Sequence, residues 1–212
     1  MLKLYYANIK QLNNENAFRA LYEKVNIQRR EKVLRCNNEK DKYRSLLAGY
    51  LLREALEQEG ICYETVTFEV EKNGKSVIKD ISSCHFSLSH AGNYAVCLIS
   101  DRRIGVDIET ASKRIFHQDK QLKNIANKVL SKDEYESFLD CPKEKITEQF
   151  LRYWTRKECY SKADGRGLSI GMNQVFTDTD QYYSRWLDED TYLSIYVEDG
   201  IFTDLQMKEL CL

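Results

Sequence analysis

The stretch Trp154–Leu168 reads Trp-Thr-Arg-Lys-Glu-Cys-Tyr-Ser-Lys-Ala-Asp-Gly-Arg-Gly-Leu. It is typical of the second half of a long helix that ends in a glycine-rich turn. Glu158 and Lys162 are separated by one helical turn, so they lie on one face of that helix. Such a pair is usually a surface ion pair worth about 0.3–0.5 kcal/mol. A chemical role for it requires partners from another part of the chain.

A second stretch, Ile104–Glu109, offers such partners. Its residues alternate, so the apolar side chains face one way and Gly105, Asp107 and Glu109 face the other. An isolated Asp-x-Glu is usually solvated or salt-bridged, but the apolar neighbours here indicate a buried strand. Together with Glu158, the two carboxylates would form an oxygen-only ligand set. Oxygen ligands with room for water and phosphate suit Mg²⁺.

The composition limits the classes of protein to consider. The chain has 212 residues, 42% of them hydrophobic and 31% charged, which is enough for one large domain or two small lobes. A net charge of −1 argues against binding to nucleic acid or to a membrane surface. No apolar run is long enough for a transmembrane helix, and residues 1–10 lack a signal-peptide core. Seven cysteines without a Cys-x-x-Cys pair indicate a reducing, cytoplasmic setting and no cysteine zinc site.

The pattern along the chain predicts an α+β fold. Apolar periodicity and turn signals predict helices at 13–35, at 41–60, from Ser131 onward, and from Pro142 to Gly165. They predict strands at 2–6, 64–70 and 84–89, a hairpin of 93–99 with 104–109, and more strands between 176 and 202. Each half holds a long helix and several strands, which allows two lobes, 1–103 and 104–212.

Basic groups beside predicted turns and helix starts are candidate phosphate ligands. Arg binds phosphate with two hydrogen bonds, and Lys acts as a point charge. Taken alone, each has an ordinary explanation: the cluster around Lys32 as a solvated face, and His90 as a core histidine. The candidates are Lys32, Arg44, Lys75, His90 and Lys162.

Three segments resemble the signature motifs of the 4′-phosphopantetheinyl transferases. They are Phe86–Gly92, Ile104–Glu109, and Trp154–Lys162 with Gly165–Leu168. Their order and wide spacing are similar to the surfactin-synthetase-type branch, in which one chain contains two similar lobes. The resemblance extends to Arg30–Lys32, Arg44–Gly49 and Gly74–Lys75, so it covers roughly residues 29–168.

The resemblance implies a fold and an activity. The fold is a pseudo-dimer of two similar lobes, each a small, mostly antiparallel sheet packed on a long helix. The N-terminal lobe would contact the phosphates of coenzyme A, and the C-terminal lobe would hold the metal and dock the carrier. The activity is Mg²⁺-dependent transfer of 4′-phosphopantetheine from coenzyme A to a serine of an apo acyl or peptidyl carrier protein, with release of 3′,5′-ADP. A monomer is expected.

The resemblance also implies roles for single residues. Asp107, Glu109 and Glu158 would hold Mg²⁺, with Asp107 also on the coenzyme A side, and Glu158 would take the proton of the carrier serine. Lys162 would contact the phosphate and stabilise the leaving group. The remaining coenzyme A ligands would be Lys32, Arg44, Lys75, Ser89 and His90.

Two departures from the family pattern are visible. Ser76 stands where relatives often have proline, and Lys42-Tyr43 precedes Arg44 where histidine is common. The residues after Leu168 match no named motif, so their role is unassigned.

A basic and apolar patch after Glu109 is a candidate docking face for an acidic carrier: Lys113, Arg114, Ile115, Phe116, Lys120 and Lys123.

Alternatives stay open at this stage. The same carboxylates would serve a Mg²⁺-dependent phosphohydrolase, with water as the nucleophile. A non-catalytic module that binds coenzyme A or a carrier is a second alternative. The sequence does not separate Mg²⁺ from Mn²⁺, and it does not separate fatty-acid, polyketide and peptide-synthetase carriers.

Overall fold

The structure is a computed structural model that describes residues 1–12, 14–71, 75–112, 119–166 and 171–212. Its α-helices are α1 (Glu15–Tyr22), α2 (Ile27–Leu34), α3 (Glu39–Gln58), α4 (Asp119–Val129), α5 (Lys132–Leu139) and α6 (Ile146–Asp164). Its strands are β1 (Leu2–Asn8), β2 (Phe68–Val70), β3 (Ser76–Ile78), β4 (His85–Ala91), β5 (Tyr94–Ser100), β6 (Ile104–Thr110), β7 (Tyr182–Trp186), β8 (Thr191–Val197) and β9 (Leu205–Glu209). The predicted α+β class is confirmed.

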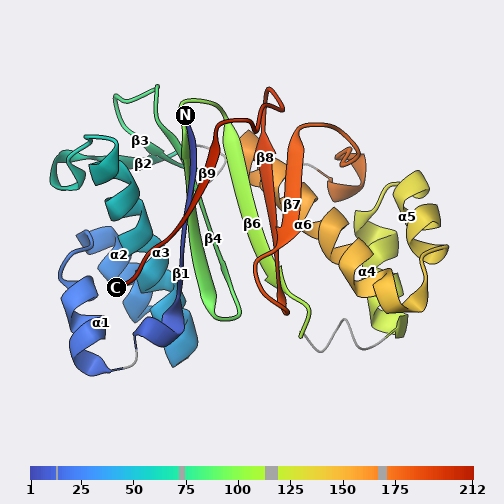
Figure 1. Cartoon of the computed structure of the whole chain (residues 1–212), viewed down its shortest axis with the longest axis horizontal. Helices are drawn as coiled ribbons and strands as arrows, with labels where there is room; N and C mark the ends of the chain where they lie inside the picture. The colour runs from blue at the N-terminus through green and yellow to red at the C-terminus, as the bar shows by residue number, and fades with distance from the viewer. Residues whose placement is uncertain (13, 72–74, 113–118, 167–170) are drawn as a thin grey trace.

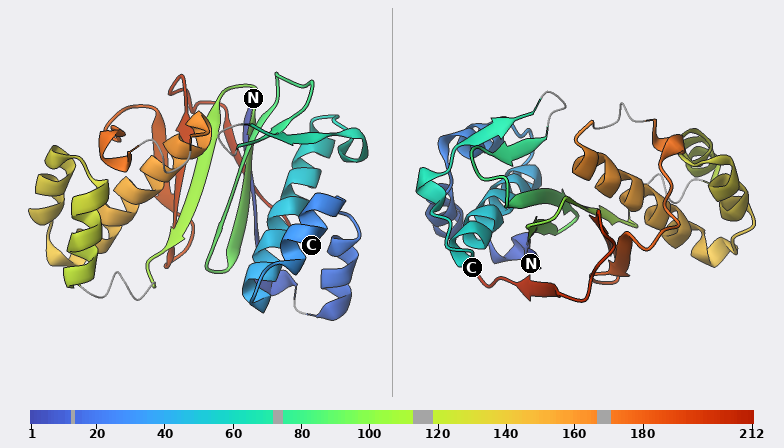
Figure 2. Two further views of the ribbon diagram at one scale, coloured as in Figure 1. Left: turned by 180° about the vertical axis from the view of Figure 1, so that it is seen from behind. Right: turned by 90° about the horizontal axis from the view of Figure 1, so that it is seen from above.

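Two sheets stand face to face in the centre of the molecule, with helices outside each (Figures 1 and 2). One sheet has the strand order β4-β5-β1-β9 and packs on α3, with α1 and α2 lying against that helix. The other has the order β6-β8-β7 and packs on α6, with α4 and α5 farther out. Apolar side chains of β1, β5, β6 and β8 fill the space between the sheets. This arrangement agrees with the predicted two-lobed fold, each lobe a sheet on a long helix.

The alternation predicted for β6 is confirmed. Ile104, Val106 and Ile108 are buried in the core between the sheets. The opposite face of the strand turns toward α6, and a side chain at Gly105 would place its Cβ 1.9 Å from the Cys159 backbone oxygen. The missing side chain at Gly105 therefore allows α6 to pack directly on β6.

The predicted hairpin between β5 and β6 is wrong. β5 pairs with β1 and β4, whereas β6 pairs with β8, so the link between β5 and β6 crosses from one sheet to the other. Both strands are buried along most of their length. Alternation and a short connection do not determine which buried strand lies alongside, which is why the sequence misassigned the pairing.

Two other predicted elements differ in extent. The stretch 13–35 forms two helices instead of one, because the side chain of Asn26 caps a new helix start at α2. Only Phe68–Val70 of the predicted strand 64–70 pairs as a strand, since Tyr63–Thr65 forms a 3-10 turn. The predicted helix start after Ser131 and the predicted helix end at Gly165 are confirmed: Ser131 forms a capping box with Glu134, and Gly165 is left-handed.

The final strand returns to the first half of the molecule. β9 pairs in parallel with β1, so residues 205–209 extend the sheet of the N-terminal half (Figures 1 and 2). The lobe boundary between 103 and 104 stays a prediction. Within the described ranges, no helix has both the length and the apolar character required to span a bilayer.

Candidate active site

Asp107 and Lys162 join β6 to α6. Lys162 Nζ donates to Asp107 Oδ1 at 2.7 Å and to the Val106 backbone oxygen at 3.0 Å. The Asp107 carboxylate is almost buried, with 7% of the residue exposed. A charge-assisted hydrogen bond of this length is stronger than one between neutral groups. Lys162 therefore bonds to the strand β6, and it is not simply the partner of Glu158 in a surface ion pair.

Glu158 shares this region with the carboxylates of β6. Its pKa is raised, first by burial and then by the negative charges of Asp107 and Glu109, while the charge of Lys162 opposes the rise. Like charges that face one region are stabilised when a cation enters it. Carboxylate oxygens without nitrogen or sulfur donors are also what a hard divalent cation prefers. The donor set therefore fits Mg²⁺ or Mn²⁺.

The three carboxylates do not form a closed ligand set as they stand. Within the described residues, the only three His, Cys, Asp or Glu ligand atoms within 4.8 Å of one another belong to Glu57, Cys62 and Glu64. Glu109 Oε1 instead accepts the backbone N–H of Thr110 at 2.9 Å. Side-chain rotation would be required to gather the carboxylates on one ion.

A cavity of about 770 Å³ lies beside these groups, between α2, α3, β2, β3 and β4 on one side and the end of α6 on the other. Glu158 lies on its wall. Its basic lining consists of Arg29, Lys32, Arg35, Lys75 and Lys162. Its apolar lining includes Leu52, Tyr63, Phe68, Val70 and Phe86. Such a lining suits a ligand that combines phosphate groups with an apolar or aromatic part.

Burial and neighbouring arginines lower the pKa values of two lysines in the cavity. The pKa of Lys32 is lowered by desolvation and then by the charge of Arg29. The pKa of Lys75 is lowered by burial and then by the charge of Arg103. Lys75 Nζ also donates to the Ala163 backbone oxygen at 3.0 Å, at the C-terminal end of α6. A bound anion would stabilise the charged forms of these lysines, because each is buried beside another cation.

Arg44 and His90 are not among the residues that line the cavity. Arg44 Nη1 donates to the Gly92 backbone oxygen at 2.8 Å, and its guanidinium also forms an ion pair with Asp41. The pKa of His90 is lowered by desolvation and then by the charge of Arg44. The two predicted phosphate ligands are therefore neighbours, and Arg44 is already neutralised by Asp41.

Ser89, a predicted coenzyme A ligand, and Arg29 make contacts that the sequence did not predict. Ser89 Oγ lies 2.8 Å from Asp107 Oδ1, which places its hydroxyl with the carboxylates. Arg29 crosses closely over Gly49, where a Cβ would lie 2.5 Å from Arg29 Cγ. Gly49 was the one sequence feature that could have indicated this contact, because a glycine inside a helix often lies where another segment packs closely against the helix.

The buried Lys157 was missed altogether. Its Nζ forms an ion pair with Glu134 at 2.7 Å and donates to the backbone oxygens of Met172 at 2.9 Å and Val175 at 2.7 Å. The side chain is fully buried. A lysine on an amphipathic helix normally reaches solvent, so no local pattern predicted this clamp between α5, α6 and the 172–175 turn.

The aromatic side chains of α6 do not attach this helix to β6. Phe150 and Trp154 stack with ring centroids 6.0 Å apart and pack in a core cluster with α4, α5 and β8. The contact of α6 with β6 is made through Gly105, because only a residue without a side chain lets the helix come so near.

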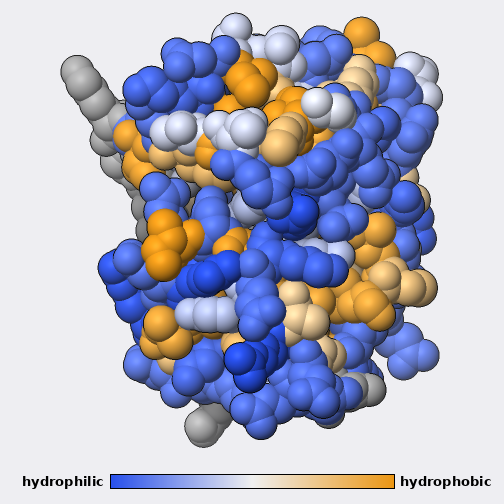
Figure 3. Space-filling view, turned by 90° about the vertical axis from the view of Figure 1, so that its left-hand side faces the viewer, coloured by the Kyte–Doolittle hydropathy of each residue, from blue (hydrophilic) through white to orange (hydrophobic). Residues whose placement is uncertain are grey.

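Only part of the predicted docking patch lies within the residues that the structure describes. Lys113, Arg114, Ile115 and Phe116 lie outside the described residues, whereas Lys120 and Lys123 are exposed on α4. On another side of the molecule, Figure 3 shows a largely hydrophilic face with separate hydrophobic patches.

Comparison with known proteins identifies the family. Residues 103–208 match the 4′-phosphopantetheinyl transferase superfamily, and residues 13–102 match the N-terminal part of 4′-phosphopantetheinyl transferases. The chain is 31% identical to the 4′-phosphopantetheinyl transferase psf-1 of Bacillus pumilus over 176 residues, which are 81% of this chain and 72% of that protein.

Two further relatives have the same name. The chain is 30% identical to the 4′-phosphopantetheinyl transferase Sfp of Bacillus subtilis over 177 residues, which are 83% of this chain and 72% of Sfp. It is 35% identical to the 4′-phosphopantetheinyl transferase HetI of a Nostoc species over 130 residues, which are 59% of this chain and 49% of HetI. The chain therefore belongs to the 4′-phosphopantetheinyl transferase superfamily and is a transferase of the Sfp type.

Proposed function

We propose that this transferase moves 4′-phosphopantetheine from coenzyme A to a serine of an apo acyl or peptidyl carrier protein, with Mg²⁺ as cofactor. The cavity of about 770 Å³ carries the proposal, because its basic and apolar lining reaches Glu158 and Lys162. Coenzyme A combines phosphate groups, an adenine ring and a long arm, and this chemistry matches that lining.

The proposed reaction is a substitution at phosphorus. The serine hydroxyl attacks the phosphorus that bears the pantetheine arm, a new P–O bond forms, and the bond to 3′,5′-ADP breaks. Glu158 takes the hydroxyl proton, directly or through water, because a hydroxyl is a weak nucleophile until a base is present. Lys162, which is bonded to Asp107, offsets the charge on the departing 3′,5′-ADP.

The metal would be held by Asp107, Glu109 and Glu158. When bound, Mg²⁺ would neutralise part of the pyrophosphate charge, and Mn²⁺ would satisfy the same oxygen ligands. Support comes from the two nearly buried carboxylates of β6 and from their effect on the pKa of Glu158. A cation would relieve the repulsion among the three groups.

The phosphates of coenzyme A would be bound by residues on both sides of the cavity, by the end of β4 and by Arg44. Arg44 would exchange Asp41 for a phosphate oxygen, since its guanidinium is paired in this structure. The carrier would dock near Lys120 and Lys123 on α4. The proposed coenzyme A ligands are Lys32, Arg44, Lys75, His90 and Lys162, together with the backbone at Ser89.

A cytosolic, monomeric enzyme completes the proposal. The seven cysteines of the chain, none in a disulfide, support a reducing compartment.

Incubation of the full chain with coenzyme A, Mg²⁺ and an apo carrier protein tests the proposal. Intact-mass measurement should show a carrier heavier by one phosphopantetheine. Glu158→Gln and Lys162→Ala should each slow transfer by about 10²–10⁴-fold, as expected for loss of a proton acceptor or of charge stabilisation. Lys132→Ala is the control, because Lys132 is 87% exposed and remote from the cavity lining.

Metal removal gives a separate check. Chelation with EDTA should abolish transfer, and excess Mg²⁺ or Mn²⁺ should restore it. Unchanged rates in both active-site variants would contradict the assigned roles. Cleavage of coenzyme A without any mass gain on the carrier would indicate a phosphohydrolase instead.

A further inference from the structure

Two serines of β4 attach that strand to β6 through their hydroxyl groups. The Val106 N–H donates to Ser87 Oγ at 3.0 Å, and the Ile108 N–H donates to Ser89 Oγ at 3.3 Å. Both serines are buried, with 6% and 8% of their surface exposed. Buried backbone N–H groups need acceptors, and here serine hydroxyls supply them between strands that belong to different sheets.

Only one of the two serines, Ser89, also forms a hydrogen bond with a carboxylate. Ser89 Oγ lies 2.8 Å from Asp107 Oδ1. Because a lone pair of that hydroxyl accepts the Ile108 N–H, its single proton is available for Asp107. The Ser89 hydroxyl is thus committed as acceptor and as donor within the protein, which leaves its side chain little capacity for a phosphate.

The same carboxylate oxygen also accepts from Lys162. Nζ of Lys162 lies 2.7 Å from Asp107 Oδ1, so this oxygen receives two donors. In the part of the chain that the structure describes, no hydrogen bond to Asp107 Oδ2 is present. The two oxygens of Asp107 therefore differ: Oδ1 is bound to the protein, and Oδ2 is available to an external ligand.

We propose that Ser89 is a positioning residue, whose hydroxyl fixes the Asp107 carboxylate with Oδ1 turned to the protein and Oδ2 presented to a divalent cation. This inference rests on the proposed metal site. Hydrogen bonds behind a ligand hold its orientation, and their loss typically weakens metal binding by about 10–100-fold. Ser89 thus acts through Asp107 instead of touching the substrate.

Ser87 provides a matched control. It lies on the same face of β4 two residues earlier, is equally buried, and accepts a β6 N–H in the same way, but it has no bond to Asp107. Ser87→Ala and Ser89→Ala each leave one buried N–H without its acceptor, so both should lower the melting temperature. Only Ser89→Ala should alter the Asp107 carboxylate.

The probe is Mn²⁺, titrated into the full chain in the presence of excess coenzyme A. Electron paramagnetic resonance of free Mn²⁺ reports the dissociation constant without any turnover. Ser89→Ala should weaken Mn²⁺ binding by about tenfold or more, while Ser87→Ala keeps the wild-type dissociation constant.

A second pair of variants removes the dependence on Ser89→Ala folding well. Ser89→Thr keeps the hydroxyl, and Ser89→Val has nearly the same shape without it. Ser89→Thr should bind Mn²⁺ at least about tenfold more tightly than Ser89→Val, because only Thr can hydrogen-bond to Asp107.

The outcomes separate this inference from the proposed function. If wild-type protein binds Mn²⁺ and modifies the carrier, but Ser89→Ala or Ser89→Val binds Mn²⁺ as tightly as its matched variant, the positioning role is wrong. If wild-type protein neither binds Mn²⁺ nor modifies a carrier, the proposed metal site and function fail first.

Discussion

Gly105 is the residue on which the contact between α6 and β6 depends. A Cβ at this position would lie 1.9 Å from the Cys159 backbone oxygen and 3.1 Å from the Ala163 backbone nitrogen. Backbone atoms inside a helix cannot move aside individually, so a side chain would displace α6 as a whole. That displacement would also separate Lys162 from Asp107.

Gly105→Ala should therefore lower the free energy of unfolding by about 1–3 kcal/mol or more, as overpacking does in a filled interior. It should also weaken coenzyme A binding measured by calorimetry. Gly60→Ala is the control: Gly60 has φ +75 and nothing within 4 Å of a Cβ. The control should lose stability through its backbone alone. Normal coenzyme A affinity in Gly105→Ala would show that the close approach is not needed.

At the scale of elements, Lys157 holds three segments together. It lies on α6, pairs with Glu134 of α5, and donates to two backbone oxygens of the 172–175 turn. Glu134 also completes the capping box at the start of α5. Burial lowers the pKa of Lys157, while Glu134 raises it. The buried charge is tolerated because its hydrogen bonds are satisfied.

Lys157→Met should destabilise the protein by about 3 kcal/mol, because it leaves the largely buried Glu134 carboxylate without its cationic partner. Urea unfolding measures the change. The double variant Lys157→Met/Glu134→Gln removes the orphaned charge and should be more stable than Lys157→Met alone. A double variant that is less stable than Lys157→Met would contradict the argument that the unpaired charge causes the loss.

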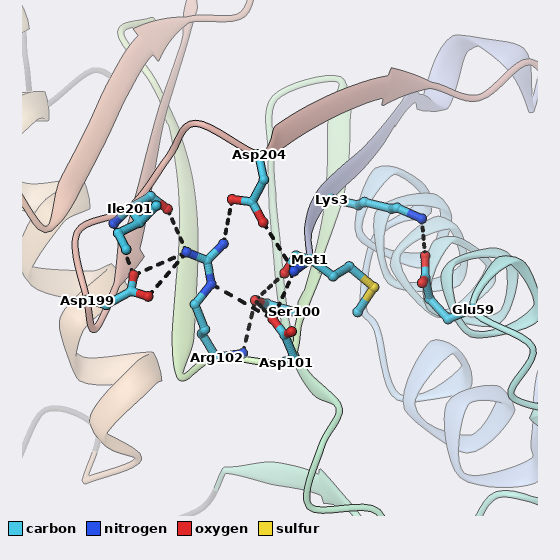
Figure 4. Close-up of polar contacts among 9 residues, drawn as sticks. All are labelled: Met1, Lys3, Glu59, Ser100, Asp101, Arg102, Asp199, Ile201 and Asp204. Atoms are coloured by element: carbon cyan, nitrogen blue, oxygen red, sulfur yellow. Dashed lines mark hydrogen bonds and ion pairs between the residues drawn. The ribbon is translucent and has the colours of Figure 1, made fainter.

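At the scale of the whole molecule, Arg102 connects the two chain crossings between the sheets (Figure 4). Its guanidinium donates to Asp199 at 3.2 Å, to the Ile201 backbone oxygen at 2.8 Å and to Asp204 at 2.6 Å. The Met1 amine lies 3.1 Å from Asp204 as well. The link between β5 and β6 is thereby tied to the link between β8 and β9.

The stabilisation by Arg102 should depend on pH. Burial raises the pKa of Asp204, but the hydrogen bonds from Arg102 and the Met1 amine outweigh it and bring the pKa below 3.8. A carboxyl group whose pKa is lower in the folded state stabilises the protein at pH values above its pKa in the unfolded state. That contribution disappears as the pH falls through its pKa in the folded state.

Arg102→Gln should therefore lower stability by about 1 kcal/mol at pH 7, and the difference from wild type should shrink as the pH falls below 3.8. Urea unfolding at pH 7 and pH 3 measures both. Arg35→Gln is the control, because Arg35 is 80% exposed and its ion pair with Glu31 is 3.5 Å long. A difference that grows in acid would contradict the assignment.

The features that the sequence predicted are local ones. The helix start at Ser131, the helix end at Gly165 and the alternation along β6 each depend on residues within one turn or one strand. Neighbouring residues alone determine these patterns, so they can be read without knowledge of the rest of the chain. The grouping of the β6 carboxylates with Glu158 and Lys162 had no such local signal and came from the resemblance to the family.

The tertiary structure decided what distant segments do to one another. It separated β5 from β6, returned β9 to β1, and gave Lys162 the Asp107 oxygen that it shares with Ser89. Alternation shows that a strand is buried but not which strand lies beside it, and a lysine on a helix face does not indicate its partner. These choices follow from how the buried surfaces and unpaired N–H groups of the whole chain are satisfied together.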